Sequence, residues 1–309
     1  MTRAFLDRYP IILGEGSMYE RLRRGASDTF DPFIAYAGML YDDNGREVLA
    51  ATHREYLDIG QRQKLPMVAG TPTWRASAER IARSRFAGKP VNEDACDFMK
   101  GLSTSYGSDS TPILIAGITG PAGDGYKPEE APDEEAARAF HAPQIEGLVD
   151  GGVDLFKVQT LPAFAEARGI ARLLAETDIP YVMSFVIRRD GTLLDGTPLD
   201  HAIVDIDDAV KRPPASYNIN CVHTSVFAAA MSVIRERNPH AAQRVLGIDA
   251  NTSAKTPEEL NGLQEIDTEA PEEFGRNVFA LHEEVGICYL GGCCGSSTEH
   301  MAQLAERCT

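Results

Sequence analysis

The sequence has few positive charges for its length. It contains 30 Lys and Arg residues against 46 Asp and Glu residues, which gives a formal net charge of -16 at pH 7. Proteins that bind nucleic acids place clustered Lys and Arg side chains against the phosphates. The chain has no such cluster, so its composition argues against a nucleic-acid partner.

Long apolar runs are also missing. No stretch approaches the roughly 18 apolar residues that a membrane-spanning helix needs. Residues Met1 to Leu13 include an acidic residue, Asp7, and a proline, and they lack the apolar core and the small-residue cleavage site of a secretory signal. We therefore expect a soluble protein in the cytoplasm, without a membrane partner.

Cysteine is scarce, because the 309 residues include only six, and these show no regular spacing. Small secreted domains rely on a dense disulfide framework, which this pattern does not match, so a reducing compartment suits it better. Three of the six stand out by their sequence context: Cys221 and the adjacent Cys293 and Cys294.

The adjacent cysteines lie in the segment Gly-Gly-Cys-Cys-Gly-Ser-Ser of residues 291–297. The glycines permit a tight turn, in which neighbouring side chains converge instead of diverging as they do along a strand. Cys221 lies at the end of an apolar run, in Tyr-Asn-Ile-Asn-Cys-Val-His of residues 217–223. Three converging thiols indicate a metal site and chemistry on sulfur. A strained disulfide between the neighbours, or plain burial of the thiols, stays open at this point.

Eight strand-like apolar runs alternate with helix-like segments, which predicts a (β/α)8 barrel. One barrel commonly takes about 250 residues, so residues 1–309 are expected to form a single domain. The predicted strands are Ile11–Leu13, Met67–Ala69, Ile113–Gly117, Val153–Val158, Tyr181–Ile187, Tyr217–Cys221, Val245–Ile248 and Ile287–Leu290. The predicted helices include Glu134–Val149, Ala163–Glu176, Ser225–Arg237, Pro271–Val285 and Thr298–Arg307.

In such a barrel, functional residues lie at the C-terminal ends of the strands. Cys221 is predicted to end the sixth strand, and Cys293 and Cys294 follow the eighth. These strands are two positions apart in the ring, so the three sulfur atoms are expected to meet over the barrel mouth. Ser296 and Glu299 have the spacing of a capping box, which predicts that Ser296 caps the last helix.

With Asn220-Cys221 on one strand and Gly-Gly-Cys-Cys-Gly after the last, the chain resembles the homocysteine S-methyltransferase family, whose zinc site carries these two motifs. Further matching segments are Phe140–Ile145, Gly152–Asp154, Ser184-Phe185, Asp190–Thr197 and Pro271–Phe274, with weaker matches at Gly14–Gly16 and Glu20–Leu22. The resemblance implies that Cys221, Cys293 and Cys294 bind Zn²⁺ and leave the fourth tetrahedral position to the incoming thiol.

The resemblance further implies methyl transfer to a thiol, in which homocysteine is the acceptor and methionine is the product. The nucleophile is then the zinc-bound thiolate of the substrate, and no protein general base is assigned. We expect the His223 side chain to pack near the metal ligands or to hold them in position, and not to serve as a ligand or a base. Cys96, Cys288 and Cys308 lack a ligand-like setting.

The residues that the resemblance assigns to the acceptor are Glu15, Gly16, Gln159, Thr160 and Asn220. Two of them depart from the family pattern. Gly14-Glu15-Gly16 stands where the family has an Asp followed by two glycines, so that Glu15 supplies its charge from the neighbouring position, and Gln159 replaces the Glu of a Glu-Thr pair. A neutral amide attracts an ammonium group less than a carboxylate does, so a different acceptor thiol remains an alternative.

The donor must carry its methyl group on a good leaving group. A chain of this length resembles the compact family members, which implies a sulfonium donor, S-methylmethionine or S-adenosylmethionine. Betaine is an alternative, and so is a methyl-corrinoid protein, which would be a separate partner. Trp74, the only tryptophan, is the candidate for the donor pocket through a cation–π contact. A non-catalytic zinc or redox-sensing protein is the alternative from another class.

Overall fold

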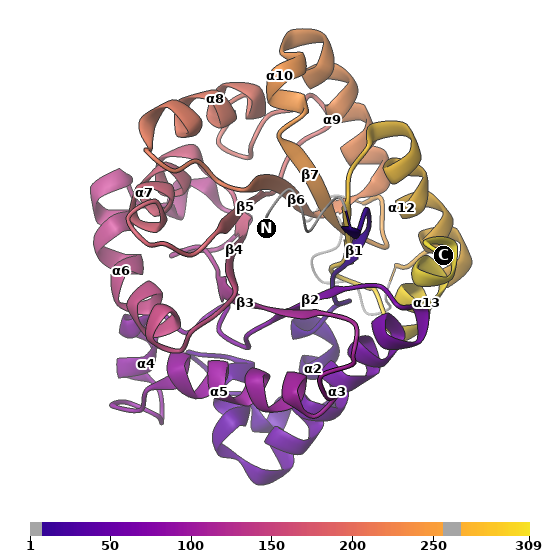
Figure 1. The fold of residues 1–309 in the computed structure, drawn as a ribbon. Coiled ribbons are helices and arrows are strands. Elements are labelled where there is room, and N and C mark those ends of the chain that lie inside the picture. The colour runs from indigo at the N-terminus through magenta and orange to yellow at the C-terminus, as the bar shows by residue number, and fades with distance from the viewer. Residues whose placement is uncertain (1–7, 256–266) are drawn as a thin grey trace.

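Eight parallel strands close into a barrel, with helices packed around the outside (Figure 1). The computed structural model describes residues 8–255 and 267–309. The strands pair in chain order, and β1 closes the ring against β8. The fold predicted from the sequence, a (β/α)8 barrel, is confirmed.

The strands are β1 (Ile12–Leu13), β2 (Met67–Gly70), β3 (Ile113–Thr119), β4 (Leu155–Leu161), β5 (Tyr181–Phe185), β6 (Ser216–His223), β7 (Val245–Asn251) and β8 (Tyr289–Gly292). The α-helices are α2 (Tyr19–Gly25), α3 (Asp43–Gln63), α4 (Ala78–Arg83), α5 (Val91–Thr104), α6 (Glu134–Asp150), α7 (Phe164–Leu174), α8 (Leu199–Ala209), α9 (Thr224–Arg237), α10 (Pro239–Ala242), α12 (Pro271–Val285) and α13 (Thr298–Arg307). Each predicted strand and helix coincides with one of these elements, although several ends differ by one to three residues.

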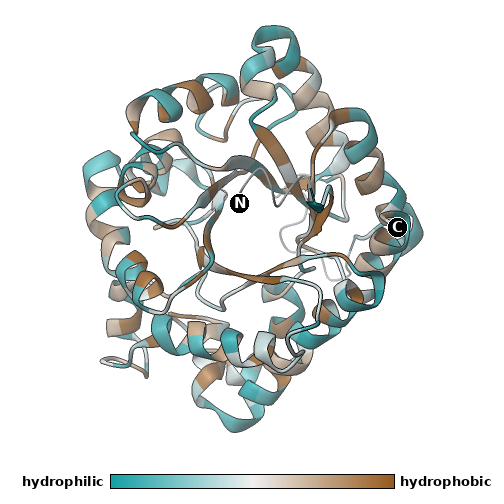
Figure 2. Cartoon of the chain, viewed as in Figure 1, coloured by the Kyte–Doolittle hydropathy of each residue, from teal (hydrophilic) through white to brown (hydrophobic). Residues whose placement is uncertain are grey.

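Apolar side chains fill the inside of the barrel and the layer between the strands and the helices. One buried cluster contains Ile12, Val68, Ala116, Ile118, Leu155, Val182 and Tyr289. A second, larger cluster joins the outer faces of the strands to the helices. Strands that are buried on both faces read as nearly continuous apolar runs, which explains why the sequence pattern located them. Figure 2 shows the same division, with brown strands and helices that turn teal faces outward.

Two strands carry a bulge near their C-terminal ends. The pairing of β4 with β5 shifts between Val158 and Leu161, and the pairing of β6 with β7 shifts between Asn220 and Val222. Within these bulges Thr160 and Cys221 have positive φ angles, 65° and 56°. The prediction that Cys221 ends its strand is therefore wrong, because β6 continues to His223 beyond the bulge. A bulge re-aims a side chain, and here it does so at the mouth of the barrel.

Helix α13 has the predicted bounds, Thr298–Arg307, but its N-cap lies one residue later than the capping pattern predicted. Its N-cap is Ser297, and the partner in the capping box is His300 instead of Glu299. Ser296 is occupied elsewhere, since its hydroxyl accepts a hydrogen bond from the Ser17 amide and donates one to the Cys293 carbonyl. Among the described residues, no helix is both long and apolar enough to cross a membrane.

Candidate metal centre and substrate cavity

Three cysteine sulfur atoms converge at the C-terminal end of the barrel. Cys221 comes from the bulge of β6, and Cys293 and Cys294 come from the turn after β8. Their Sγ atoms all lie within 4.8 Å of one another, and those of Cys221 and Cys293 are 2.6 Å apart. All six cysteines of the chain are free thiols. A disulfide between the adjacent cysteines is therefore not formed.

The turn that carries the two adjacent cysteines is tied to β7. The amide of Cys293 donates to the carbonyl of Ala250, and the amide of Cys294 donates to Oδ1 of Asn251. Gly295, at φ 84°, completes the turn, and a Cβ atom at this position would lie 2.0 Å from the Thr252 hydroxyl. The turn thus requires glycine at residue 295, and β7 fixes the direction of both thiols.

The protonation of the three thiols is interdependent. Hydrogen bonds from Cys293 and Cys294 lower the pKa of Cys221 well below its ordinary value, and the bond to Cys221 raises the pKa of Cys293. Three buried thiolates this close repel one another, so a bound cation is needed before all three lose their protons. Three sulfur atoms that all lie within 4.8 Å of one another can each approach a single zinc ion to about 2.3 Å. Thiolate ligands also favour zinc among the common metal ions. The donor set fits a zinc ion.

Asn220 links the two bulges to each other. Its Oδ1 atom accepts hydrogen bonds from the amide of Thr160 at 3.0 Å and the hydroxyl of Ser184 at 2.8 Å. Its Nδ2 atom donates to the Thr160 hydroxyl at 2.8 Å and to Cys221 Sγ at 3.3 Å. Because it donates to the sulfur atom, Asn220 orients Cys221 and stabilises its thiolate form.

A cavity of about 330 Å³ opens beside the three thiols. It is lined by every residue that the sequence assigned to the site: Glu15, Gly16, Trp74, Gln159, Thr160, Asn220, Cys221, Cys293 and Cys294. These residues come from loops or strand ends that are up to 279 positions apart, between Glu15 and Cys294. The barrel therefore brings the candidate metal ligands and the candidate substrate residues into one space.

Glu15 is held at the wall of this cavity by two partners. Its Oε1 atom lies 2.6 Å from Nδ1 of His53, and its Oε2 atom accepts the amide hydrogen of Gly70 at 2.9 Å. The other ring nitrogen of His53 is buried without a hydrogen-bond partner. An N–H there would be unsatisfied, so we place the hydrogen on Nδ1, from which it is donated to Glu15.

The structure also shows cavity residues that the sequence analysis did not identify. Lys157, Asp249 and Tyr289 form a buried, hydrogen-bonded group that lines the cavity. A lysine inside the apolar run of β4 is the one pattern in the sequence that indicated it. Tyr126, from the loop after β3, also lines the cavity. Burial and the nearby thiols raise the pKa of Tyr126 well above its ordinary value, so its hydroxyl stays protonated.

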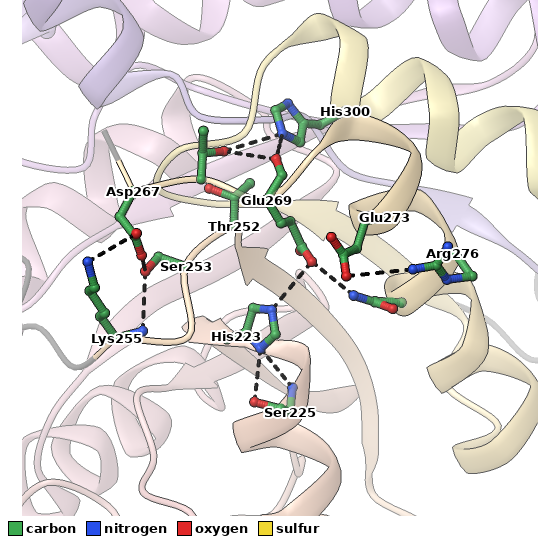
Figure 3. Close-up of polar contacts among 12 residues, drawn as sticks. His223, Ser225, Thr252, Ser253, Lys255, Asp267, Glu269, Glu273, Arg276 and His300 are labelled. Atoms are coloured by element: carbon green, nitrogen blue, oxygen red, sulfur yellow. Dashed lines mark hydrogen bonds and ion pairs between the residues drawn. The ribbon is translucent and has the colours of Figure 1, made fainter. Parts of the chain in front are cut away.

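A polar cluster around Glu269 supports the cysteine-bearing loops from behind (Figure 3). Glu269 Oε2 accepts a hydrogen bond from Asn277 of α12 and lies 3.5 Å from Nε2 of His223, at the end of β6. The Glu269 amide donates a hydrogen bond to the carbonyl of Thr252, which follows β7. The Glu269 carbonyl forms a hydrogen bond with Nε2 of His300 on α13. His223 thus belongs to this supporting cluster and, among the described residues, lies outside the group of potential metal ligands.

The sequence model of a family described as homocysteine S-methyltransferase matches residues 12–308. The chain belongs to the homocysteine S-methyltransferase family. Among its relatives, homocysteine S-methyltransferase YbgG of Bacillus subtilis (strain 168) is 26% identical over 324 residues, which cover 97% of this chain and 95% of that protein. Homocysteine S-methyltransferase of Escherichia coli (strain K12) is 28% identical over 249 residues, covering 74% of this chain and 75% of the relative.

Solved structures of the same family have the same fold. The homocysteine methyltransferase MmuM from Escherichia coli, in its oxidized form, superposes with a TM-score of 0.76 at 24% identity, over 99% of this chain and 98% of that chain. Its metallated form gives a TM-score of 0.75 at 24% identity, over 99% of both chains. Membership of the family confirms the prediction, made from the two cysteine motifs, that the protein is an S-methyltransferase.

Proposed function

We propose that this protein methylates the thiol of homocysteine to give methionine, with Cys221, Cys293 and Cys294 as ligands of a zinc ion and a sulfonium compound as the methyl donor. The observation that carries the proposal is the convergence of three thiols on a cavity of about 330 Å³, in a chain of this family. In the reaction, the acceptor sulfur forms a bond to the methyl carbon. The bond from that carbon to the donor sulfur breaks, and its electron pair leaves with the donor as a neutral thioether. The thiol proton of the acceptor is released to solvent.

When bound, a zinc ion with an open fourth position acts as a Lewis acid and lowers the pKa of the acceptor thiol, which is about 8.5 in the free state. The protein residues prepare this chemistry in two ways. Asn220 donates a hydrogen bond to Cys221, which spreads the negative charge of the three thiolates. The β6 bulge and the turn after β8 fix the directions of the sulfur atoms, so little reorganisation accompanies the reaction.

Glu15 and Gln159 are proposed to bind the ammonium group of the acceptor. Glu15 supplies the charge, because His53 and the Gly70 amide hold its carboxylate at the cavity wall. Gln159 lines the same cavity and offers a carbonyl oxygen as a neutral acceptor. Gly16 and Thr160 complete the wall, and a side chain at Gly16 would collide with the ring of Tyr56.

The donor is proposed to approach along the aromatic wall of the cavity. Tyr19, Tyr36 and Trp74 line it, and the rings of Tyr19 and Trp74 meet edge to face with centroids 5.6 Å apart. A methyl group on a positive sulfur is attracted to the faces of such rings. Arg75 already covers one face of Trp74 at 4.6 Å, which leaves Tyr19, Tyr36 and the free side of Trp74 for the donor.

The experiment that tests this proposal is methyl transfer by the zinc-loaded protein, followed by mass spectrometry. Homocysteine is offered with S-methylmethionine, S-adenosylmethionine or betaine in separate reactions, beside a zinc-stripped control. If a sulfonium donor yields more methionine with the zinc-loaded protein than with the zinc-stripped control, the full proposal is supported. Methionine from betaine alone contradicts the choice of donor. No product with any donor, while zinc is bound, contradicts the reaction with free small-molecule donors and directs the search to a corrinoid protein or another thiol.

A further inference from the structure

A buried ion pair lies at the floor of the cavity. Lys157 of β4 donates to Oδ1 of Asp249 on β7 at 2.8 Å and to the hydroxyl of Tyr289 on β8. The Tyr289 hydroxyl in turn donates to Asp249 at 2.8 Å. All three side chains are at least 95% buried, and all three line the cavity. The group therefore joins three strands of the barrel across its interior.

Neighbouring glycines leave the space that this group needs. A Cβ atom on Gly14 would lie 2.1 Å from the Tyr289 hydroxyl, and one on Gly291 would lie 2.5 Å from Asp249. A buried ion pair stabilises a fold little, because apolar residues of the same volume usually serve as well or better. The surrounding interior of the barrel is apolar. A ligand that uses the charges explains this pair better than stability does.

The pair has binding capacity left over. An ammonium group has three N–H donors, and the two hydrogen bonds of Lys157 use two of them. Oδ2 of Asp249 also lies 2.7 Å from the Lys157 ammonium nitrogen, so both carboxylate oxygens face this one group. Because Lys157 also lines the cavity, a ligand there can share its ammonium group with Asp249 and Tyr289.

The charges around the cavity indicate what this donor binds. Among the described residues of the lining, the only basic one besides Lys157 is Arg23, which is exposed on α2. The three thiols and Glu15 make the rest of the wall acidic or neutral. An acceptor with a carboxylate must therefore place that group on the one buried cation, because a buried carboxylate without a partner is strongly unfavourable.

We propose that Lys157 binds the α-carboxylate of the acceptor, and that the Lys157–Asp249 pair selects thiols that are amino acids. This inference rests on the proposed methylation of homocysteine. The acceptor then lies with its sulfur at the three cysteines and its carboxylate at the floor. Asp249 and Tyr289 are positioning residues, which hold the ammonium group of Lys157 toward the cavity.

The test compares the wild-type protein with the double variant Lys157→Met/Asp249→Asn, which removes both charges of the pair. Single changes of Lys157 or Asp249 are avoided, because each leaves the other residue as an unpaired buried charge. Three thiols are titrated into each zinc-loaded protein by calorimetry: homocysteine, 3-mercaptopropylamine, which lacks the carboxylate, and 4-mercaptobutyrate, which lacks the ammonium group. Thermal unfolding checks that the double variant is folded, and Lys157→Gln/Asp249→Asn replaces it if it is not.

Loss of Lys157 is expected to weaken the binding of homocysteine and of 4-mercaptobutyrate about 10-fold or more. This is the effect of losing one hydrogen bond between charged groups. Binding of 3-mercaptopropylamine is expected to change by less than about 2-fold. An equal loss for all three thiols overturns the inference alone, since it indicates a general change of the cavity. Failure of homocysteine to bind the zinc-loaded wild-type protein overturns both this inference and the proposed function.

Discussion

Single residues set the charge balance beside the three sulfur atoms. Cys221 has a lowered pKa and Cys293 a raised one, so the metal-free cluster shares its protons unevenly. Glu15 adds a carboxylate at the wall, while Gln159 is neutral. The affinity of the cavity for an ammonium group therefore depends on very few side chains, and changes of one residue test each role.

Replacement of Cys221, Cys293 or Cys294 by Ala is expected to abolish stoichiometric zinc binding and methyl transfer, because two thiolates hold zinc far more weakly than three. Metal analysis of each purified variant measures the zinc content. Replacement of Cys96, a buried thiol outside the cluster, by Ala is the matched control and is expected to keep one zinc per chain. Full zinc content in all three site variants contradicts the ligand assignment.

The change Gln159→Glu is expected to lower the KM for homocysteine about 3- to 10-fold, because a carboxylate replaces a neutral partner of the ammonium group. The same change is expected to raise the KM for 4-mercaptobutyrate, which brings a carboxylate and no ammonium. Steady-state kinetics with both thiols measure the two effects. Unchanged KM values for both thiols contradict a position of Gln159 beside the acceptor.

The sequence allowed prediction of these residues to different degrees. The cysteines and Asn220 lie in short motifs that identify them directly. Lys157, Asp249 and Tyr289 were missed, since 92 and 132 positions separate the lysine from its partners and only the closed barrel brings them together. A single charged residue in an apolar strand indicates a special role, but it does not indicate a partner.

Strands and helices explain how the thiols acquire their directions. The apolar runs predicted all eight strands, because parallel strands buried on both faces leave a strong pattern. The bulges at Thr160 and Cys221 were not predictable, since a positive φ at a residue other than glycine depends on the pairing with neighbouring strands. The same limit explains the one-residue error in the N-cap of α13, where a long-range hydrogen bond from Ser17 occupies Ser296.

The supporting cluster behind the metal centre gives an element-level prediction. The change Glu269→Ala removes the bond to Asn277 and the charge beside His223, and it is expected to cost about 1–3 kcal/mol of unfolding free energy. Glu273→Ala is the control, because Glu273 forms only an exposed pair with Arg276 and its loss is expected to cost about 0.5 kcal/mol or less.

Denaturant unfolding of both variants measures these free energies, and zinc titration measures the metal affinity. Glu269→Ala is expected to weaken zinc binding as well, since the cluster joins the ends of β6 and β7 to α12 and α13 (Figure 3). Equal stability losses in the two variants contradict the supporting role of Glu269.

The whole barrel assembles the site from strands β1 to β8, and no short segment contains it. The family match over residues 12–308 agrees with this dispersed site, and the assignment of residues 1–309 to one domain stays a prediction. A metal at the centre of such an assembly links ligand chemistry to the stability of the fold, because it binds only the folded arrangement.

Removal of the metal is expected to expose the three ligand thiols to alkylation. In the zinc-loaded protein, iodoacetamide at pH 8 is expected to leave Cys221, Cys293 and Cys294 unmodified, and a chelator is expected to make them reactive. Cys96 is expected to stay unmodified in both states, because its side chain is fully buried in the core, whereas the three ligand thiols line the open cavity. Peptide mass spectrometry counts the modified sites. Alkylation of the three ligands at equal rates with and without the chelator contradicts the metal centre.

The central claim is that the three-cysteine centre binds the acceptor through its thiol and removes the thiol proton. Calorimetric titration of homocysteine into zinc-loaded and metal-free protein at pH 7, in buffers of different ionisation enthalpy, measures both the binding and the protons released. We predict release of about one proton per homocysteine bound to the zinc-loaded protein, since a free thiol of pKa about 8.5 is protonated at this pH. We predict no comparable binding to the metal-free protein. Binding without proton release, or equal binding to both forms, would contradict the claim.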